Sequence, residues 1–280
     1  MDFAEKLLQA VRKNKSLLCL GLDPDPALMP ETGIFEFNKA IIDSTSDIVC
    51  AYKPNLAFYE ALGTEGLTAL QRTVDYIPGD IPIIGDAKRG DVGHTARAYA
   101  KALFEVLGFD AVTVNPYLGY DSIEPFMSYA DKAVFILCLT SNPGAVDFQK
   151  AACSPEGEKA RQPLYQLVAR RAREWNRRNN VGLVVGATYP EELREIRQLC
   201  PDMLLLIPGI GTQGGSLDWA VRYGTDSKGG SAIISSSRQI LYASKGDNFA
   251  GAARQAADDL RRLINSLLPG SSVARGIDGS

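Results

Sequence analysis

Short runs of wholly apolar residues recur along the chain, separated by stretches in which apolar and polar positions are mixed. Runs of this kind are typical of strands buried on both faces of a parallel sheet. The runs lie at residues 16–22, 48–52, 81–84, 110–115, 133–139, 181–186, 203–207 and 232–234. We therefore expect eight strands.

Most of the stretches between the runs carry apolar residues three or four positions apart, a spacing that indicates helices with one buried face. The expected helices lie at residues 2–15, 34–46, 67–77, 96–107, 122–130, 190–199 and 248–268, with a basic helix ending near Asn179. Gly108 is expected to end the helix before it, since glycine readily takes the left-handed conformation of a helix C-cap.

Eight buried strands that alternate with helices favour a (β/α)₈ TIM barrel of the α/β class. Barrels of this length commonly form one domain, so we expect residues 1–280 to be a single domain. Its core would span about 16–245, followed by a closing helix at 248–268 and a loose tail at 269–280. A doubly wound open sheet is the competing fold.

Composition narrows the functional classes. The net charge of −3 and the pI of about 5.4 give no overall field that favours nucleic acid or an anionic membrane. The basic run at 170–178 is read as a solvated helix face. The N-terminus lacks the apolar segment of a signal peptide, and no apolar run approaches the length of a membrane span. A cytoplasmic protein is expected, with no nucleic-acid or membrane partner.

The five cysteines are scattered without metal-ligand spacing, so reduced thiols are expected rather than disulfides or a zinc site. His94 is the only histidine, and a surface or capping role is expected for it. Neither a catalytic triad nor a metal cluster can be built from these residues. No metal and no cofactor are predicted.

Polar side chains follow the expected strands at the end where barrel enzymes place their sites. The third run leads into Asp86-Ala87-Lys88-Arg89-Gly90-Asp91, and Lys53 follows the second run. Because side chains alternate along a strand, Asp86 and Lys88 should project to the same side. A surface ion pair is the alternative interpretation. The position after a buried strand favours a catalytic role for these residues.

A glycine-rich loop, Pro208-Gly-Ile-Gly-Thr-Gln-Gly-Gly215, follows the seventh run. Glycines let backbone N–H groups approach an anion closely, and barrels commonly bind phosphate after strands seven and eight. Gln213 can donate through its amide, and Arg238, after the eighth run, supplies a bidentate donor for phosphate oxygens. The loop is therefore predicted to bind phosphate, with a merely flexible turn as the alternative.

Taken in order along the chain, these features resemble orotidine 5′-phosphate decarboxylases. The resemblance spans roughly residues 16–245, and the Gly186–Pro190 segment is similar to the longer bacterial subgroup. The residues that carry it are Asp23, Lys53, Asp86, Lys88, Asp91, Thr95, Ser141 with the following Asn-Pro-Gly, the 208–215 loop with Gln213, and Arg238. The Asp-x-Lys-x-x-Asp motif also occurs in a sister family of phosphosugar synthases and decarboxylases. Gly93-His94, in the turn after the motif, departs from the pattern of other branches of the family, which carry Pro and a different polar residue there.

The resemblance implies a cofactor-free homodimer that converts orotidine 5′-phosphate to UMP, in the last step of de novo pyrimidine nucleotide synthesis. It implies an alternating charge network of Lys53, Asp86, Lys88 and Asp91, in which Asp91 reaches the neighbouring subunit's site. Lys88 would protonate C6. The substrate contacts implied are Asp23 and Lys53 on ribose, Thr95 of the partner chain, Ser141 on the pyrimidine, and Pro208, Gly209, Gln213 and Arg238 at the phosphate.

The chemistry of the motif agrees with this activity. Loss of carbon dioxide leaves a carbanion, which a fixed positive charge stabilises most in the transition state. A lysine flanked by two aspartates remains protonated, whereas a Schiff-base lysine needs a lowered pKa. Two alternatives remain open. One is a metal-dependent phosphosugar aldolase or epimerase on the same barrel, and the other is a non-catalytic phosphate-ligand sensor.

Overall fold

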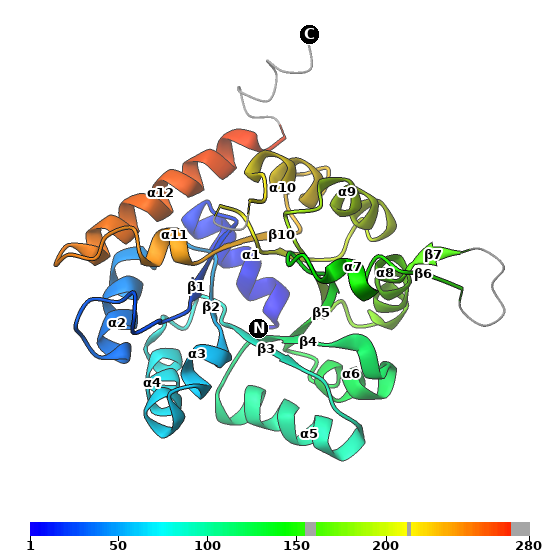
Figure 1. Cartoon of the computed structure of the whole chain (residues 1–280), viewed down its shortest axis with the longest axis horizontal. Helices are drawn as coiled ribbons and strands as arrows, with labels where there is room; N and C mark the ends of the chain where they lie inside the picture. Colours follow the sequence, from blue (N-terminus) through cyan, green and yellow to red (C-terminus); the bar gives the residue numbers. More distant parts are fainter. Residues whose placement is uncertain (155–160, 212–213, 270–280) are drawn as a thin grey trace, which may run out of the picture.

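Eight parallel strands alternate with helices in the computed structural model, which describes residues 1–154, 161–211 and 214–269 (Figure 1). The strands are β1 Leu18–Leu22, β2 Ala51–Pro54, β3 Ile84–Arg89, β4 Ala111–Val114, β5 Ala133–Leu139, β8 Val181–Val185, β9 Leu205–Ile207 and β10 Ala232–Ser236. They pair in the order β2-β1-β10-β9-β8-β5-β4-β3. The backbone N–H of Tyr52 donates to the carbonyl of Pro82 over 3.0 Å, and bridges join Tyr52 to Ile83 and Asn55 to Asp86. These contacts join β2 to β3, so the expected (β/α)₈ barrel is confirmed.

The helices lie around the strands in Figure 1, except for α1, which crosses the middle of the barrel. They are α1 Phe3–Asn14, α2 Ile34–Thr45, α3 Leu56–Glu60, α4 Gly63–Tyr76, α5 Gly93–Lys101, α6 Tyr120–Met127, α7 Ala145–Phe148, α8 Leu164–Trp175, α9 Pro190–Leu199, α10 Leu217–Gly224, α11 Arg238–Leu241 and α12 Phe249–Leu267. A π-helical turn, Ala102–Val106, extends α5, and a 3₁₀ turn, Pro116–Leu118, precedes α6. Gly108 has φ +78°, as expected for the residue that ends this helical segment.

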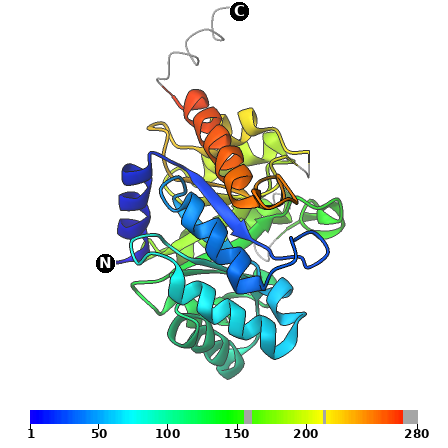
Figure 2. The ribbon, with the colours of Figure 1, turned by 90° about the vertical axis from the view of Figure 1, so that its left-hand side faces the viewer.

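Helix α1 covers the N-terminal end of the barrel. It begins at Phe3 because the Asp2 carboxylate accepts the Glu5 N–H over 2.9 Å and the Glu5 side chain returns the contact. Phe3 and Leu7 are buried with interior residues of the barrel, and the Phe3 ring meets Phe135 of β5 edge to face at 5.8 Å. Figure 2 shows this helix on one side of the barrel, apart from the outer helices. The interior is therefore packed from this end.

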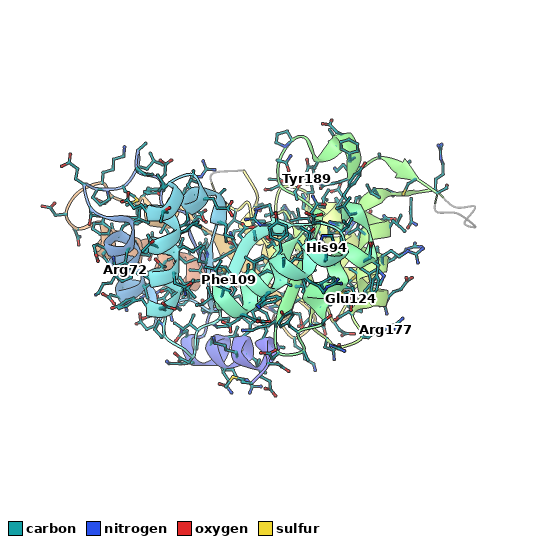
Figure 3. All side chains as sticks on the ribbon, turned by 90° about the horizontal axis from the view of Figure 1, so that it is seen from below. Arg72, His94, Phe109, Glu124, Arg177 and Tyr189 are labelled. Carbon is teal, nitrogen blue, oxygen red and sulfur yellow. The ribbon has the colours of Figure 1, made fainter. Side chains whose placement is uncertain are left out.

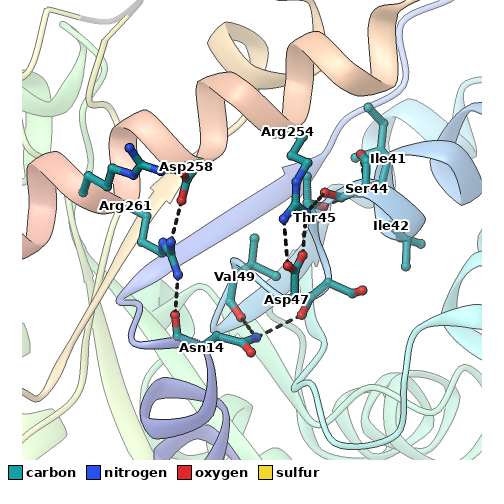
Figure 4. A network of polar contacts seen from close by, with 12 residues as sticks. Asn14, Ile41, Ile42, Ser44, Thr45, Asp47, Val49, Arg254, Asp258 and Arg261 are labelled. Carbon is teal, nitrogen blue, oxygen red and sulfur yellow. Dashed lines mark hydrogen bonds and ion pairs between the residues drawn. The ribbon is translucent and has the colours of Figure 1, made fainter.

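Helix α12 is fixed to the chain's N-terminal third through polar contacts (Figure 4). Arg254 forms a bidentate pair with Asp47, with N–O distances of 2.6 and 2.8 Å, just after α2. Arg261 donates to the carbonyl of Asn14, at the end of α1, and the Asn14 amide donates to the carbonyls at 46 and 49. The closing helix predicted at 248–268 thus forms at Phe249–Leu267.

Several elements were not expected from the sequence. Helices α3, α7, α10 and α11 and the short hairpin of β6 (Ala152–Cys153) with β7 (Gln162–Pro163) are elements that the sequence pattern did not predict. Strand β3 runs from Ile84 to Arg89 rather than over the expected residues 81–84, so Asp86 and Lys88 lie within the strand and Asp91 lies beyond it. The tail predicted at 269–280 lies outside the described residues from residue 270 onward.

The cysteines are free thiols, and Cys19, Cys50, Cys138 and Cys200 are buried. Among residues 1–154, 161–211 and 214–269, no helix is long and apolar enough to cross a bilayer. Within the same ranges, His, Cys, Asp and Glu side chains form no cluster of three or more with the arrangement of a metal site.

Candidate active site

The charged motif lies on an irregular part of β3. The pairing of β3 with β4 changes register between Gly85, opposite Val112, and Arg89, opposite Val114. Three β3 residues therefore face a single β4 residue, which makes this segment a bulge. Within it Lys88 has φ +47°, a left-handed conformation that costs a non-glycine residue roughly 1–2 kcal/mol. Strain of this size is commonly kept at functional sites.

Asp86 binds two lysines with its two carboxylate oxygens. Its Oδ2 lies 2.8 Å from Lys53 Nζ on β2, and its Oδ1 lies 2.6 Å from Lys88 Nζ. Burial alone would raise the pKa of Asp86, but the attraction of Lys53 and Lys88 holds it well below its ordinary value. The predicted proximity of Asp86 and Lys88 is confirmed.

The two lysines have different environments. Burial alone would lower the pKa of Lys53, but the neighbouring carboxylates of Asp86 and Asp23 raise it above its ordinary value, so this ammonium stays charged. The side chain of Lys53 is 7% exposed, whereas that of Lys88 is 49% exposed. Lys53 is thus a largely buried charge on the cavity wall, and Lys88 is the more exposed of the two lysines.

Asp23 follows β1 and lies near the same charges. Its Oδ1 is buried without a hydrogen-bond partner among the described residues. Burial raises the pKa of Asp23, and this effect outweighs the attraction of Lys53 and a hydrogen bond from Ser237. A buried acceptor without a partner costs free energy, which a ligand hydroxyl could recover by donating to it.

A cavity of about 690 Å³ opens at the C-terminal ends of the strands and collects most of the predicted site residues. Those that line it are Asp23, Lys53, Asp86, Lys88, Ser141, Pro208, Gly209 and Arg238. Figure 3 shows α1 at one end of the barrel and Tyr189 toward the other. Phe3 of α1 packs on Phe135 near the start of β5, whereas Ser141 of the cavity wall follows the end of β5, so α1 and the cavity lie at opposite ends of the barrel.

Asp91 and Thr95 are not among the residues that line this cavity. Both are partly exposed, and the Asp91 carboxylate accepts the N–H of Val92 at the start of α5. His94, labelled in Figure 3, is exposed in the first turn of α5, as expected for a surface residue. In this one chain, the described site thus contains Lys53, Asp86 and Lys88 without Asp91.

The loop after β9 bends sharply where it is described. Gly209 and Gly211 have φ +97° and +79°, and a Cβ at Gly211 would overlap the Gln239 side chain. Arg238 begins α11, is exposed, and forms no ion pair with a described residue. Gln213 lies outside the described residues. Pro208, Gly209 and Arg238 thus bring backbone and a free guanidinium to one side of the cavity.

The sequence did not single out several polar residues of the site. The hydroxyl of Thr113 on β4 donates to Asp86 Oδ1 over 2.9 Å. Asn55, after β2, lines the cavity and forms a backbone β-bridge with Asp86. Tyr242 joins the loop after β1 through its hydroxyl. A signal was present for Thr113, since it is the one polar residue among those of β4, but threonine is also an ordinary strand residue.

The fold and the site together define a (β/α)₈ barrel enzyme with a lysine–aspartate charge network at the C-terminal ends of its strands. The model of the orotidine 5′-phosphate decarboxylase / HUMPS family matches residues 16–254. The chain belongs to this family.

Named relatives cover nearly the whole chain. Orotidine 5′-phosphate decarboxylase of Dehalococcoides mccartyi strain BAV1 is 54% identical over 266 residues, which are 95% of this chain and 98% of the relative. The enzyme of Roseiflexus castenholzii is 53% identical over 275 residues, 96% of this chain and 99% of the relative. The solved structure of Leishmania donovani OMP decarboxylase has a TM-score of 0.84 and 40% identity, with 95% of this chain and 99% of that chain covered.

Proposed function

We propose that the chain is an orotidine 5′-phosphate decarboxylase, a carboxy-lyase that forms UMP in the last step of de novo pyrimidine nucleotide synthesis. The observation that carries this function is the Lys53–Asp86–Lys88 network in the cavity, in a chain 54% identical to a decarboxylase of that name. The four buried free thiols fit a reducing compartment, and we place the enzyme in the cytoplasm.

The proposed reaction places Lys88 beside the reacting carbon. Cleavage of the bond to the carboxylate leaves an electron pair at C6, and the nearby ammonium of Lys88 stabilises this charge as it develops. Lys88 then transfers a proton to C6, which completes UMP. Asp86 supports this role because its Oδ1 holds the Lys88 ammonium at 2.6 Å before the substrate arrives.

The remaining cavity residues fit the other parts of the substrate. We assign Asp23 and Lys53 to the ribose hydroxyls, since Asp23 has a buried oxygen without a described partner. Ser141 follows β5 on the cavity wall and is assigned to the pyrimidine. Pro208, Gly209 and Arg238 are assigned to the phosphate, together with Gln213.

We propose that two copies of the chain share their active sites. Asp91 and Thr95 lie outside the cavity of their own chain, beside the exposed Val92. Exposed apolar side chains continue after β4 at Tyr117 and Leu118, and Tyr117 is 79% exposed. A second copy that covers these residues would bury them and bring Asp91 and Thr95 to the site of its neighbour.

The metal-dependent aldolase or epimerase is less well supported. Both Asp86 oxygens already bind ammonium groups, so a cation there would have to displace a lysine. Exhaustive EDTA treatment should therefore leave activity unchanged, and a loss that magnesium restores would favour the aldolase. A phosphate sensor has no need for Lys53, Asp86 and Lys88, because none of them is among the residues assigned to the phosphate.

The direct test of the reaction is incubation with orotidine 5′-phosphate while the pyrimidine absorbance and released carbon dioxide are followed. We expect stoichiometric conversion to UMP. The variant Lys88→Ala should bind UMP and lack decarboxylation, whereas Lys101→Ala, a lysine of α5 remote from the cavity, should behave as wild type. No turnover by the wild-type chain would refute the proposed function.

Shared sites are tested by mixing two inactive variants, Lys88→Ala and Asp91→Ala. Equal co-refolding gives about half heterodimers, each with one intact site, so roughly a quarter of wild-type activity should return. If Asp91 serves its own chain, every site carries a defect and mixing restores nothing. Native mass measurement of heterodimers is the control.

A further inference from the structure

Thr113 is the one β4 residue that faces the bulge of β3. Its neighbours Val112 and Val114 pair with Gly85 and Arg89, so Thr113 lies opposite Asp86, Ala87 and Lys88. Val112 and Val114 pack in the outer core, whereas Ala111 packs in the barrel interior. Because side chains alternate along a strand, Thr113 faces the interior below the cavity, where it is 1% exposed.

The hydroxyl of Thr113 contacts both charged residues of the bulge. It donates to Asp86 Oδ1 over 2.9 Å and accepts the backbone N–H of Lys88 over 2.9 Å. The first contact fixes the rotation of the carboxylate that holds the Lys88 ammonium. The second contact satisfies an N–H that the bulge removes from regular pairing and holds the residue whose φ is +47°.

We propose that Thr113 is a positioning residue for the decarboxylation, an inference that rests on the proposed function. Its hydroxyl fixes the position of the Lys88 ammonium in two ways. It holds the backbone of Lys88, and it holds the Asp86 carboxylate that binds the ammonium. Without the hydroxyl, Asp86 Oδ1 loses a donor and the strained backbone of Lys88 loses its acceptor. The ammonium then has a wider range of positions, and a small displacement of a reacting group slows a reaction severely.

Two comparisons isolate the hydroxyl: wild type with Thr113→Val, and Thr113→Ser with Thr113→Ala. Thr113→Val removes it and keeps the branched shape, and Thr113→Ser keeps it and removes the methyl group. Thr113→Ala removes both, so the comparison of Ser with Ala measures the hydroxyl again if the valine variant does not fold. Thr73→Val is the matched control, because the buried Thr73 hydroxyl also donates to one group, the Ala69 carbonyl, and accepts from another, Asn38.

We expect Thr113→Val to lower kcat roughly 10- to 100-fold, the range of a lost hydrogen bond to a charged group. UMP affinity should stay at the wild-type level, since the assigned ribose and phosphate contacts remain. Thr113→Ser should restore most of kcat relative to Thr113→Ala. Thr73→Val should lower the melting temperature and leave kcat unchanged.

The inference is overturned if Thr113→Val keeps the wild-type kcat, if Thr113→Ser is no better than Thr113→Ala, or if UMP affinity falls in parallel with kcat. A purely structural role would lower stability and affinity together and would not separate kcat from binding. Absence of turnover in the wild-type chain would refute the proposed function instead, so the two failures are distinguished by the wild-type assay.

Discussion

The hydroxyl of Tyr242 donates to the backbone carbonyl of Asp23 over 2.7 Å, although 219 positions separate the two residues in the chain. The same hydroxyl accepts the N–H of Asp25 over 2.7 Å. Tyr242, just after α11, thereby fixes the loop after β1 on which Asp23 lies, whose Oδ1 is buried without a partner among the described residues.

Tyr242→Phe should loosen this loop and leave the packing intact, since the ring stacks on Phe37 at 6.1 Å in either case. We expect the free energy of unfolding to fall by about 1–2 kcal/mol, as for two lost hydrogen bonds. KM for orotidine 5′-phosphate should rise several-fold with kcat little changed. Tyr129→Phe, which loses a hydroxyl contact to Glu105 away from the cavity, is the control. An unchanged KM would contradict the role of Tyr242.

Asp86→Asn should destabilise the protein by about 3–5 kcal/mol near neutral pH, because it leaves the buried Lys53 without its partner. The pKa of Asp86 is held below its ordinary value, so its ionised form is favoured by folding. This contribution is complete above the unfolded pKa of about 4 and is lost as the pH falls below it.

The gap in stability between wild type and Asp86→Asn should therefore be constant from roughly pH 6 to pH 8 and narrow below about pH 4. Urea unfolding at a series of pH values measures it. Asp43→Asn, at an exposed pair with Lys39, should give a smaller gap throughout. A gap that widens in acid would show that Asp86 is not ionised in the folded protein.

Arg238→Ala tests the phosphate assignment. It removes charge-assisted hydrogen bonds that contribute on the order of 1.5–3 kcal/mol each. We expect kcat/KM to fall for orotidine 5′-phosphate and to change little for orotidine, which lacks the phosphate. Arg177→Ala, at an exposed arginine labelled in Figure 3, controls for the change in net charge. Equal losses on both substrates would remove Arg238 from the phosphate site.

Arg197→Lys should reduce stability without affecting chemistry. The buried Arg197 guanidinium donates to the carbonyls of Gly224, Cys200, Pro201, Met203 and Ser231. Lysine has a single nitrogen and cannot reach all of them, so we expect a loss of about 3 kcal/mol. Activity per folded molecule should be unchanged, and Arg194→Lys on the exposed face of α9 is the control. A fall in kcat would show that Arg197 also shapes the active site.

The sequence predicted the barrel because most strands contain an apolar run, as burial on both faces of a sheet requires, and β5 forms at the expected residues 133–139. It failed where local signals conflict with tertiary structure. Strand β3 continues to Arg89 because Asp86 is bridged to Asn55 and Arg89 pairs with Val114 on either side of the bulge, although charged residues rarely indicate a buried strand. Helices α10 and α11 follow glycine- and serine-rich segments that resemble loops.

Residues that follow different strands could be assigned to one site from the sequence, but contacts between individual side chains far apart in sequence could not. Asp86 and Lys88 could be grouped because they are two positions apart. The contact of Thr113 with both depends on the two-residue shift in register between β3 and β4, which no local pattern encodes. The contact of Tyr242 with Asp23 depends on closure of the barrel in the same way.

Phe3 and Leu7 of α1 fill the N-terminal end of the barrel interior, whereas the described cavity opens at the C-terminal ends of the strands. Because α1 closes the N-terminal end, substrate, carbon dioxide and UMP all pass through the opening at the C-terminal ends of the strands, where Arg238 lies. A bound product thus obstructs the entry of the next substrate. Orotidine 5′-phosphate can enter only after UMP has left. Product and substrate should accordingly compete, so a cell that accumulates UMP would slow the enzyme without any separate regulatory site.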